Sequence, residues 1–178
     1  QLALSHYQFE AIHPFHDGNG RTGRIINILV LVSKGLLELP VLYLSRYIIE
    51  HKPEYYRYLR GVTESQDWEP WVLYLLDAVE STAQSTRQRI LDIRMLLEKT
   101  TERARQELPK RIYSKDLIEL IFRQPYTKGQ FVVDAGIAER QTAAEYLKAL
   151  EEIGVLAPKK VGRENLYLNV ALYELLSI

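Results

Sequence analysis

The sequence contains no cysteine, and this excludes disulfide bonds, thiolate metal sites and thiol nucleophiles. The absence fits a reducing compartment, so we expect a cytoplasmic location. A charge imbalance is also missing, since Lys plus Arg and Asp plus Glu both number 23. Such a balance indicates no general attraction to nucleic acid, anionic membranes or acidic substrates, so any charge-based function must be local.

Long apolar runs are missing as well. The longest, from Ile25 to Val32 with Asn27 as an interruption, is far shorter than the roughly 20 residues that span a bilayer, so we expect no membrane partner. The first residues lack Met, a basic start and a small-residue cleavage site, which predicts no secretory signal and a chain that continues upstream. The 178 residues, 47% of them hydrophobic, suffice for one good core or for a moderate core and a small satellite domain.

Helical periodicity dominates the chain up to Pro109 and predicts an all-helical bundle. We expect helices over about residues 3–12, 21–34 and 43–50, another from Pro53, one from Glu69 past Ala83, and a charged one over 86–108. The helix that starts near Arg21 is apolar on nearly every side, which is typical of a central, fully buried helix.

After Pro109 the pattern changes to shorter elements. We expect helices over about residues 116–123, 128–134 and 139–153, then a two-stranded hairpin at 155–157 and 165–168. Three helices and a hairpin predict a small winged helix-turn-helix domain. The fold class is therefore mainly α, with a catalytic core at residues 1–84 whose N-terminal part we expect upstream, a helical connector at 85–109, and the winged domain at 110–178.

Glycines bend the chain between the first two predicted helices. The segment from His13 to Arg24 reads His-Pro-Phe-His-Asp-Gly-Asn-Gly-Arg-Thr-Gly-Arg. Gly18 and Gly20 allow a tight turn and a close approach of backbone N–H groups to a ligand, and the helix that follows directs its positive end to the same point. This pattern predicts a site for an anion.

The side chains of the segment indicate which anion. Asn19, Arg21 and Arg24 add donors, and this cluster suits a polyphosphate such as that of ATP better than a single carboxylate. Asp17 is a hard oxygen ligand that suits Mg²⁺ bridging two phosphates. His13, at the end of the preceding helix, is the side chain suited to accept a proton as general base.

The segment resembles the signature of the Fic family: His, any residue, Phe, any residue, Asp or Glu, Gly-Asn-Gly-Arg, two residues, Arg. Every defined position is filled. The resemblance covers about Leu2 to Val79, and the chain from about Lys110 is similar to a winged-helix tail of some bacterial members. It implies a Fic-type helical bundle that transfers AMP from ATP to a Tyr, Thr or Ser hydroxyl of a target protein, with release of pyrophosphate.

The resemblance also implies roles for single residues. His13 would be the general base, Asp17 the Mg²⁺ ligand, and Arg21 and Arg24 the groups that hold the β- and γ-phosphates. The remaining ATP-binding residues that we expect are Gly18, Asn19, Gly20, Thr22, Gly23 and, near the adenine, Tyr56. Phe15 would anchor the loop in the core.

Several alternatives stay open at this stage. Relatives that phosphorylate carry Lys near the second glycine of the loop, so Gly20 favours AMP transfer, while transfer of phosphocholine or UMP remains open. A zinc site or a metal-dependent phosphohydrolase would need more ligands than His13 and His16.

The second hypothesis is a nucleotide-sensing transcriptional regulator. Residues 110–178 hold ten Lys plus Arg and nine Asp plus Glu, a net charge of +1, which is weak for binding DNA. The residues suited to DNA contacts are Arg140, Gln141, Thr142 and Lys148 in a major groove and Lys159, Lys160 and Arg163 at phosphates. A docking or dimerising module fits the same residues, so a homodimer is possible.

Overall fold

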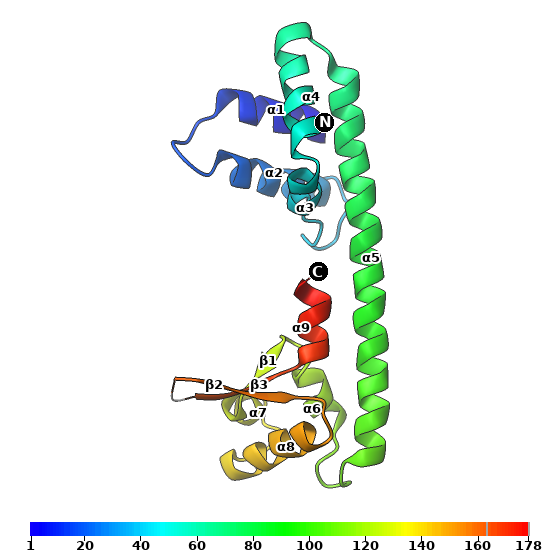
Figure 1. The fold of residues 1–178 in the computed structure, drawn as a ribbon, viewed down its shortest axis with the longest axis vertical. Helices are drawn as coiled ribbons and strands as arrows, with labels where there is room; N and C mark the ends of the chain where they lie inside the picture. Colours follow the sequence, from blue (N-terminus) through cyan, green and yellow to red (C-terminus); the bar gives the residue numbers. More distant parts are fainter. Residues whose placement is uncertain (163, 178) are drawn as a thin grey trace. The chain divides into compact units, whose positions relative to one another are not determined.

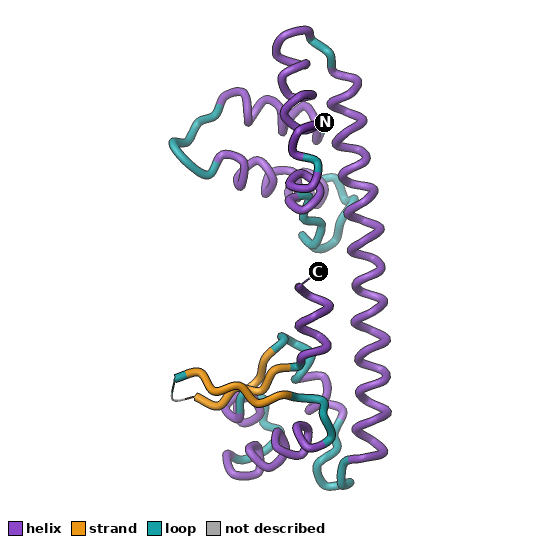
Figure 2. Tube along the Cα trace, viewed as in Figure 1, coloured by secondary structure: helices purple, strands orange, loops and turns teal. Residues whose placement is uncertain are grey.

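A computed structural model describes residues 1–162 and 164–177. The chain divides into two units, Gln1–Gln88 and Arg89–Ile178, each of which is described by itself. Helices make up most of both units, and one small sheet lies in the second (Figures 1 and 2). The predicted mainly α fold class is confirmed. Within the described residues, no helix combines the length and the apolar character needed to cross a membrane.

The first unit consists of helices only. Its elements are α1 (Leu2–Ile12), α2 (Asn19–Ser33), α3 (Ser45–Glu50), α4 (Lys52–Ser65) and the first part of α5 (Trp68–Glu107). The helices α1 and α2 form a hairpin whose connecting loop carries the glycine-rich segment (Figure 1). The core of this unit is built from Ala3, Leu31, Leu42, Leu44, Ile48, Tyr55, Val62, Trp71, Tyr74, Leu75 and Ala78.

The helix α2 is less buried than its composition predicts. Ile28 and Leu31 lie in the interior, but Ile25 and Leu29 are 56% and 57% exposed. The prediction of a fully buried central helix is therefore wrong for the described residues. Ile25 and Leu29 stand one helical turn apart, so they share one face of α2, and this face is largely exposed.

The helix α5 runs without a break from Trp68 to Glu107, where the sequence indicates one pattern past Ala83 and a second over 86–108. The division between the two units falls within this helix. Trp71, Tyr74, Leu75 and Ala78 pack in the first unit. Ala104 and Leu108, from the segment expected to be a connector, are buried in the second.

The second unit combines short helices with a three-stranded antiparallel sheet. Its further elements are α6 (Lys115–Leu120), β1 (Tyr126–Thr127), α7 (Gly129–Asp134), α8 (Arg140–Glu152), β2 (Ala157–Val161), β3 (Glu164–Leu168) and α9 (Val170–Ser177). The strand order is β1-β3-β2, and Leu168 lies opposite Tyr126 on one side and Ala157 on the other. The core comprises Ala104, Leu108, Ile112, Leu117, Ile118, Leu120, Ile121, Val132, Ala143, Leu147, Leu150 and Leu156.

Two elements of this unit have no counterpart in the predictions, β1 and α9. A two-residue strand such as β1 carries no periodicity, and it forms because Tyr126 and Thr127 pair with β3. The helix α9 starts at Asn169, whose side-chain Oδ1 accepts a hydrogen bond from Leu172 N at 3.1 Å while its Nδ2 donates to Ile121 O at 3.3 Å. Asn169 thus caps α9 and joins it to the end of α6.

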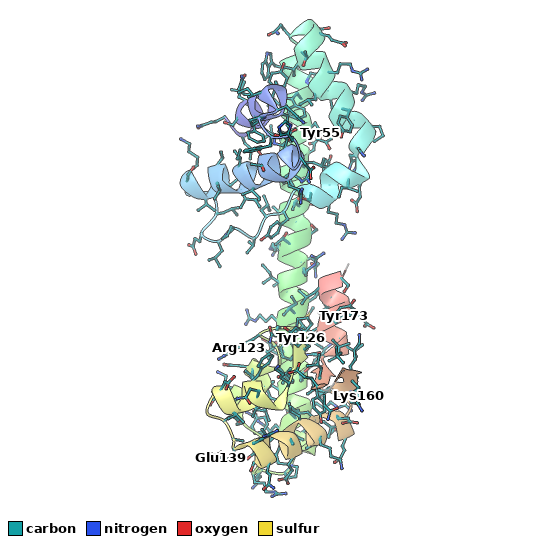
Figure 3. The ribbon with its side chains drawn as sticks, turned by 90° about the vertical axis from the view of Figure 1, so that its left-hand side faces the viewer. Tyr55, Arg123, Tyr126, Glu139, Lys160 and Tyr173 are labelled. Carbon is teal, nitrogen blue, oxygen red and sulfur yellow. The ribbon has the colours of Figure 1, made fainter. Side chains whose placement is uncertain are left out.

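The second unit also holds the residues proposed for DNA contacts. Arg140 and Gln141 are exposed at the start of α8, and Lys159 and Lys160 are exposed on β2, where Figure 3 labels Lys160. Lys148 pairs with Glu152 at 3.9 Å, so part of the positive charge of α8 is compensated within the helix. Arg163 lies outside the described residues.

Candidate active site

The loop between α1 and α2 begins with a left-handed residue. His13 follows the last residue of α1 with φ 49° and ψ 56°, and its backbone N–H donates to Phe9 O at 3.0 Å. Such a conformation is uncommon for a residue other than glycine, and it is a sparsely populated region that functional sites use. It turns the chain away from the helix and leaves the His13 side chain exposed.

The turn into α2 depends on Gly18. Its φ of 85° lies in the left-handed region, and a Cβ at this position would meet Arg21 Nη2 at 3.3 Å. Asp17 Oδ1 accepts the Gly18 N–H at 2.6 Å, and Arg21 Nη2 donates to Asp17 Oδ2 at 3.1 Å. Thr22 Oγ1 donates to Gly18 O at 3.1 Å. The first turn of α2 is therefore held by its own side chains.

Asn19 fastens the loop to this turn. Its side chain is buried, its Oδ1 accepts from Phe15 N at 3.0 Å, and its Nδ2 donates to Phe15 O at 2.6 Å. Both polar atoms of the amide thus bond the loop backbone. Phe15 itself is 52% exposed, so the prediction that its ring anchors the loop in the core is wrong for this structure. The backbone of Phe15 is what the fold holds.

A cavity of about 490 Å³ opens beside this loop, between α1, α2, α3 and α4. It brings together four of the predicted site residues, namely His13, Gly20, Arg24 and Tyr56. A smaller cavity of about 250 Å³ is lined by Arg21 and again by Arg24, together with Tyr43. Arg24 is therefore shared by both cavities. The predicted residues that line neither cavity are Asp17, Gly18, Asn19, Thr22 and Gly23.

The larger cavity combines an apolar wall with cationic groups. Ile48, Ile49 and Leu59 supply the apolar part, and Tyr55 packs edge-on against Tyr56 at 5.3 Å between ring centroids. The cationic groups are Arg24 and Lys52, and Lys52 Nζ lies 5.9 Å from the centroid of the Tyr56 ring. Neither cation forms an ion pair with a carboxylate of the described residues. The arrangement suits a ligand with a flat ring at one end and negative charge at the other.

A buried polar network supports one wall of this cavity. The ring of His6, on α1, forms two hydrogen bonds. Its Nε2 lies 2.9 Å from Tyr55 Oη, and its Nδ1 accepts from Asn27 Nδ2 at 3.1 Å. Burial lowers the pKa of His6 to about 4, so the ring is neutral near pH 7. Figure 3 shows Tyr55 among the helices of this unit. The network joins α1, which His13 directly follows, to α2 and α4, which carry Arg24 and Tyr56.

Three polar residues of the cavity, Glu10, Lys52 and Tyr55, are not among the site residues predicted from the sequence. Lys52 and Tyr55 precede Tyr56 in the chain, and only the crossing of α4 with the hairpin places them at the loop. For Glu10 the sequence does offer a signal. It is a charged residue four positions after His6 and three before His13, so these residues share one side of the chain at helical spacing.

Asp17 is the residue predicted to bind Mg²⁺. Its carboxylate is exposed and already accepts from Gly18 N and Arg21. Among the described residues, no group of three or more His, Cys, Asp or Glu side chains could hold a metal ion. Mg²⁺ needs only one or two protein carboxylates when phosphates and water complete its octahedron, so the residues present are compatible with Mg²⁺ that arrives with a nucleotide.

Comparison with known proteins gives matches in both units. The family model of the Fic/DOC family matches residues 1–31, which include α1, the loop and most of α2. The model described as "Protein adenylyltransferase SoFic-like, C-terminal domain" matches residues 96–172.

Similar curated proteins are also found. A protein adenylyltransferase Fic of Aedes aegypti is 36% identical over 80 residues, which are 45% of this chain and 15% of the relative. One of Drosophila willistoni is 32% identical over 108 residues, or 58% of this chain and 20% of the relative. The chain thus spans no more than a fifth of the length of these relatives.

The glycine-bent loop between α1 and α2 fills each defined position of the Fic signature. Residues 1–31 of the chain thus resemble the Fic/DOC family. The second unit is similar to the C-terminal domain of SoFic-like protein adenylyltransferases.

Proposed function

We propose that this protein transfers AMP from ATP to a hydroxyl group of a target protein. The observation that supports the proposal most directly is the single cavity lined by His13, Gly20, Arg24 and Tyr56. A volume of about 490 Å³ falls in the range of small-molecule sites. The names of the relatives, protein adenylyltransferase Fic, agree with this activity.

The chemistry follows from the polarity of the cavity. The adenine would pack on the apolar wall beside Tyr56, and the phosphates would lie at Arg24 and Arg21, at the N-terminus of α2. Arg21 can reach phosphate by exchanging its exposed partner Asp17, a pair that contributes little to stability. Asp17 would hold Mg²⁺, which when bound neutralises charge on the polyphosphate.

The transfer itself needs a base. The target hydroxyl attacks the α-phosphorus and forms a new P–O bond, while the bond from the α-phosphorus to the bridging oxygen breaks and pyrophosphate leaves. His13, exposed at the mouth of the cavity, takes the hydroxyl proton. Asn19 supports this step through the loop backbone, since both of its bonds go to Phe15, two residues beyond His13.

The test uses the full-length protein, Mg²⁺ and ATP labelled either at the α- or at the γ-phosphate. We expect label from the α-phosphate to enter a target, or the enzyme itself, and label from the γ-phosphate to stay in solution. His13→Ala should lower the labelling rate by about 10²-fold or more, because general base catalysis contributes about 10²–10⁴.

The matched control is His16→Ala, which removes an exposed imidazole from the same loop. It should label like the wild type. Transfer from the γ-phosphate would indicate a kinase instead, and equal labelling by His13→Ala would remove the base from the mechanism. Labelled UTP and CDP-choline, offered in the same assay, test the two remaining transfer reactions.

DNA and a second copy of the chain are the two further partners that the sequence suggests. Binding of DNA through residues 110–178 and formation of a homodimer stay predictions. No relative or family description named above mentions DNA.

A further inference from the structure

One carboxylate of the larger cavity has no role in the chemistry above. Glu10, on α1, lines the cavity with His13 and Arg24, and its Oε1 is buried without a hydrogen-bond partner among the described residues. A buried acceptor left without a donor costs about 1–3 kcal/mol, more when it is charged. Among the described residues, the Glu10 side chain has no ion pair that would offset this cost, and its Oε1 has no hydrogen bond.

The space for this carboxylate comes from Gly23. A Cβ at position 23 would lie 2.6 Å from Glu10 Oε1 and 3.1 Å from His6 Cε1. Only a residue without a side chain lets the carboxylate lie between α1 and α2 at this level. Gly23 therefore makes room for Glu10 and does not line the cavity itself.

The charges around Glu10 come from three helices. On α1 lies the neutral His6 and directly after it His13, on α2 Arg24, and on α4 Lys52 with Tyr55 and Tyr56. Burial raises the pKa of Glu10, while His13 and Arg24 act in the opposite direction. Among the described residues that line this cavity, Glu10 is the only carboxylate.

We propose that Glu10 is a positioning residue for His13. Its carboxylate, one helical turn before His13 and facing the same cavity, favours the imidazolium that forms when His13 takes the hydroxyl proton. This is the part that a third, anionic group plays behind a catalytic base. The inference rests on the proposed function, and it adds that His13 and Glu10 act together in accepting the proton.

The experiment compares Glu10→Gln, which keeps the shape and removes the charge, with Glu10→Asp, which keeps the charge, in the full-length protein. Glu38→Gln, an exposed loop carboxylate of the same unit, is the control. Three quantities are measured for each: the labelling rate with α-labelled ATP between pH 5 and 9, the affinity for Mg²⁺ and ATP by calorimetry, and the NMR titration of the His13 ring.

We expect Glu10→Gln to lower the labelling rate about tenfold or more and to change the affinity for ATP less than threefold. The acidic limb of its rate profile, and the midpoint of the His13 titration, should move to lower pH, because the protonated ring loses its anionic neighbour. Glu10→Asp should recover part of the rate, and Glu38→Gln should match the wild type.

A Glu10→Gln variant with the wild-type rate and an unmoved His13 titration overturns the inference while leaving the proposed function intact. The inference is also overturned if Glu10→Asp loses as much rate as Glu10→Gln and neither pH profile changes. That pattern would mean that Glu10 acts through packing alone. If the wild type binds ATP but transfers no label from it, the proposed function fails, and the role of Glu10 in it fails as well.

Discussion

Burial shifts the pKa values of two residues of the first unit, His6 and Glu10, in opposite directions. Their effects on the free energy of unfolding at acidic pH therefore oppose each other. His6 is neutral in the fold, with its pKa lowered to about 4 from 6.5, so the unfolded chain binds its proton first as the pH falls. The pKa of Glu10 is raised from 4.5, so the folded chain binds this proton first. His6 therefore removes stability below about pH 6.5, and Glu10 restores some of it nearer 4.5.

The first prediction concerns His6. Its contribution to the free energy of unfolding is fully present above about pH 6.5, decreases as the pH falls toward 4, and by then has lost on the order of 3 kcal/mol. The physical reason is that burial withdraws the water that would stabilise a charged ring, and the positive charge of Arg24 acts in the same direction. His6→Gln cannot take this proton, so its free energy of unfolding should depend less on pH.

Tryptophan fluorescence in urea at several pH values measures this effect. Both tryptophans, Trp68 and Trp71, lie in the first unit, and Trp71 stacks on His6 at 5.9 Å between ring centroids. The control His16→Gln removes an exposed imidazole and should keep the wild-type slope. Equal slopes for wild type and His6→Gln between pH 6.5 and 4 would show that His6 is not the group responsible.

At the level of elements, the hairpin of α1 and α2 depends on how closely the two helices approach at Gly23. Alanine is the better helix former by about 1 kcal/mol, so propensity alone favours Gly23→Ala. Its Cβ, however, would lie 2.6 Å from Glu10 Oε1 and 3.1 Å from the buried ring of His6. Overpacking of this kind costs typically about 1–3 kcal/mol, so the contact outweighs the propensity.

We therefore expect Gly23→Ala to lower the free energy of unfolding of the first unit by about 1 kcal/mol and to slow AMP labelling. Gly61→Ala is the matched control, since Gly61 lies inside α4 and its Cβ would meet nothing closer than Asp67 Cβ at 4.0 Å. That variant should be stabilised by up to about 1 kcal/mol. Urea unfolding of both variants measures the difference, and a stabilised Gly23→Ala would contradict a tight crossing.

The sequence predicts the elements of the hairpin well because the signals are local. Gly18 and Gly20 mark the turn, and the apolar pattern marks the helices on either side. Other features depend on contacts between distant segments. Lys52 reaches the cavity only because α4 crosses the hairpin, and the exposure of Ile25 depends on which face of α2 finds a neighbour. Periodicity shows that a helix is apolar without showing what covers it.

At the level of the whole molecule, the chain joins two cores through one helix. The division lies between Gln88 and Arg89, inside α5, while the matched C-terminal family model begins at residue 96 of the same helix. The core of the second unit includes Ala104 from this helix and Leu108 directly after it, with Leu97 packed against the core. The end of α5 is thus part of the second unit and not only a link to it.

This packing leads to a prediction about fragments. Residues 89–178 keep Leu97, Ala104 and Leu108, so this fragment should unfold cooperatively by itself in a thermal melt followed by circular dichroism. Residues 110–178 lose all three. Burial of a leucine side chain contributes about 1.5–3 kcal/mol, so this loss is large against the ~5–15 kcal/mol that stabilises a typical domain. The shorter fragment should lack a cooperative transition.

Point variants in the longer fragment separate packing from chain length. Leu108→Ala removes a buried side chain and should cost about 2–5 kcal/mol, whereas Met95→Ala, at a largely exposed position of the same helix, should cost much less. A fragment 110–178 that melts at the temperature of 89–178 would mean that α5 contributes nothing to this core. The second unit would then fold without α5, and the buried side chain of Leu108 would not be needed for its stability.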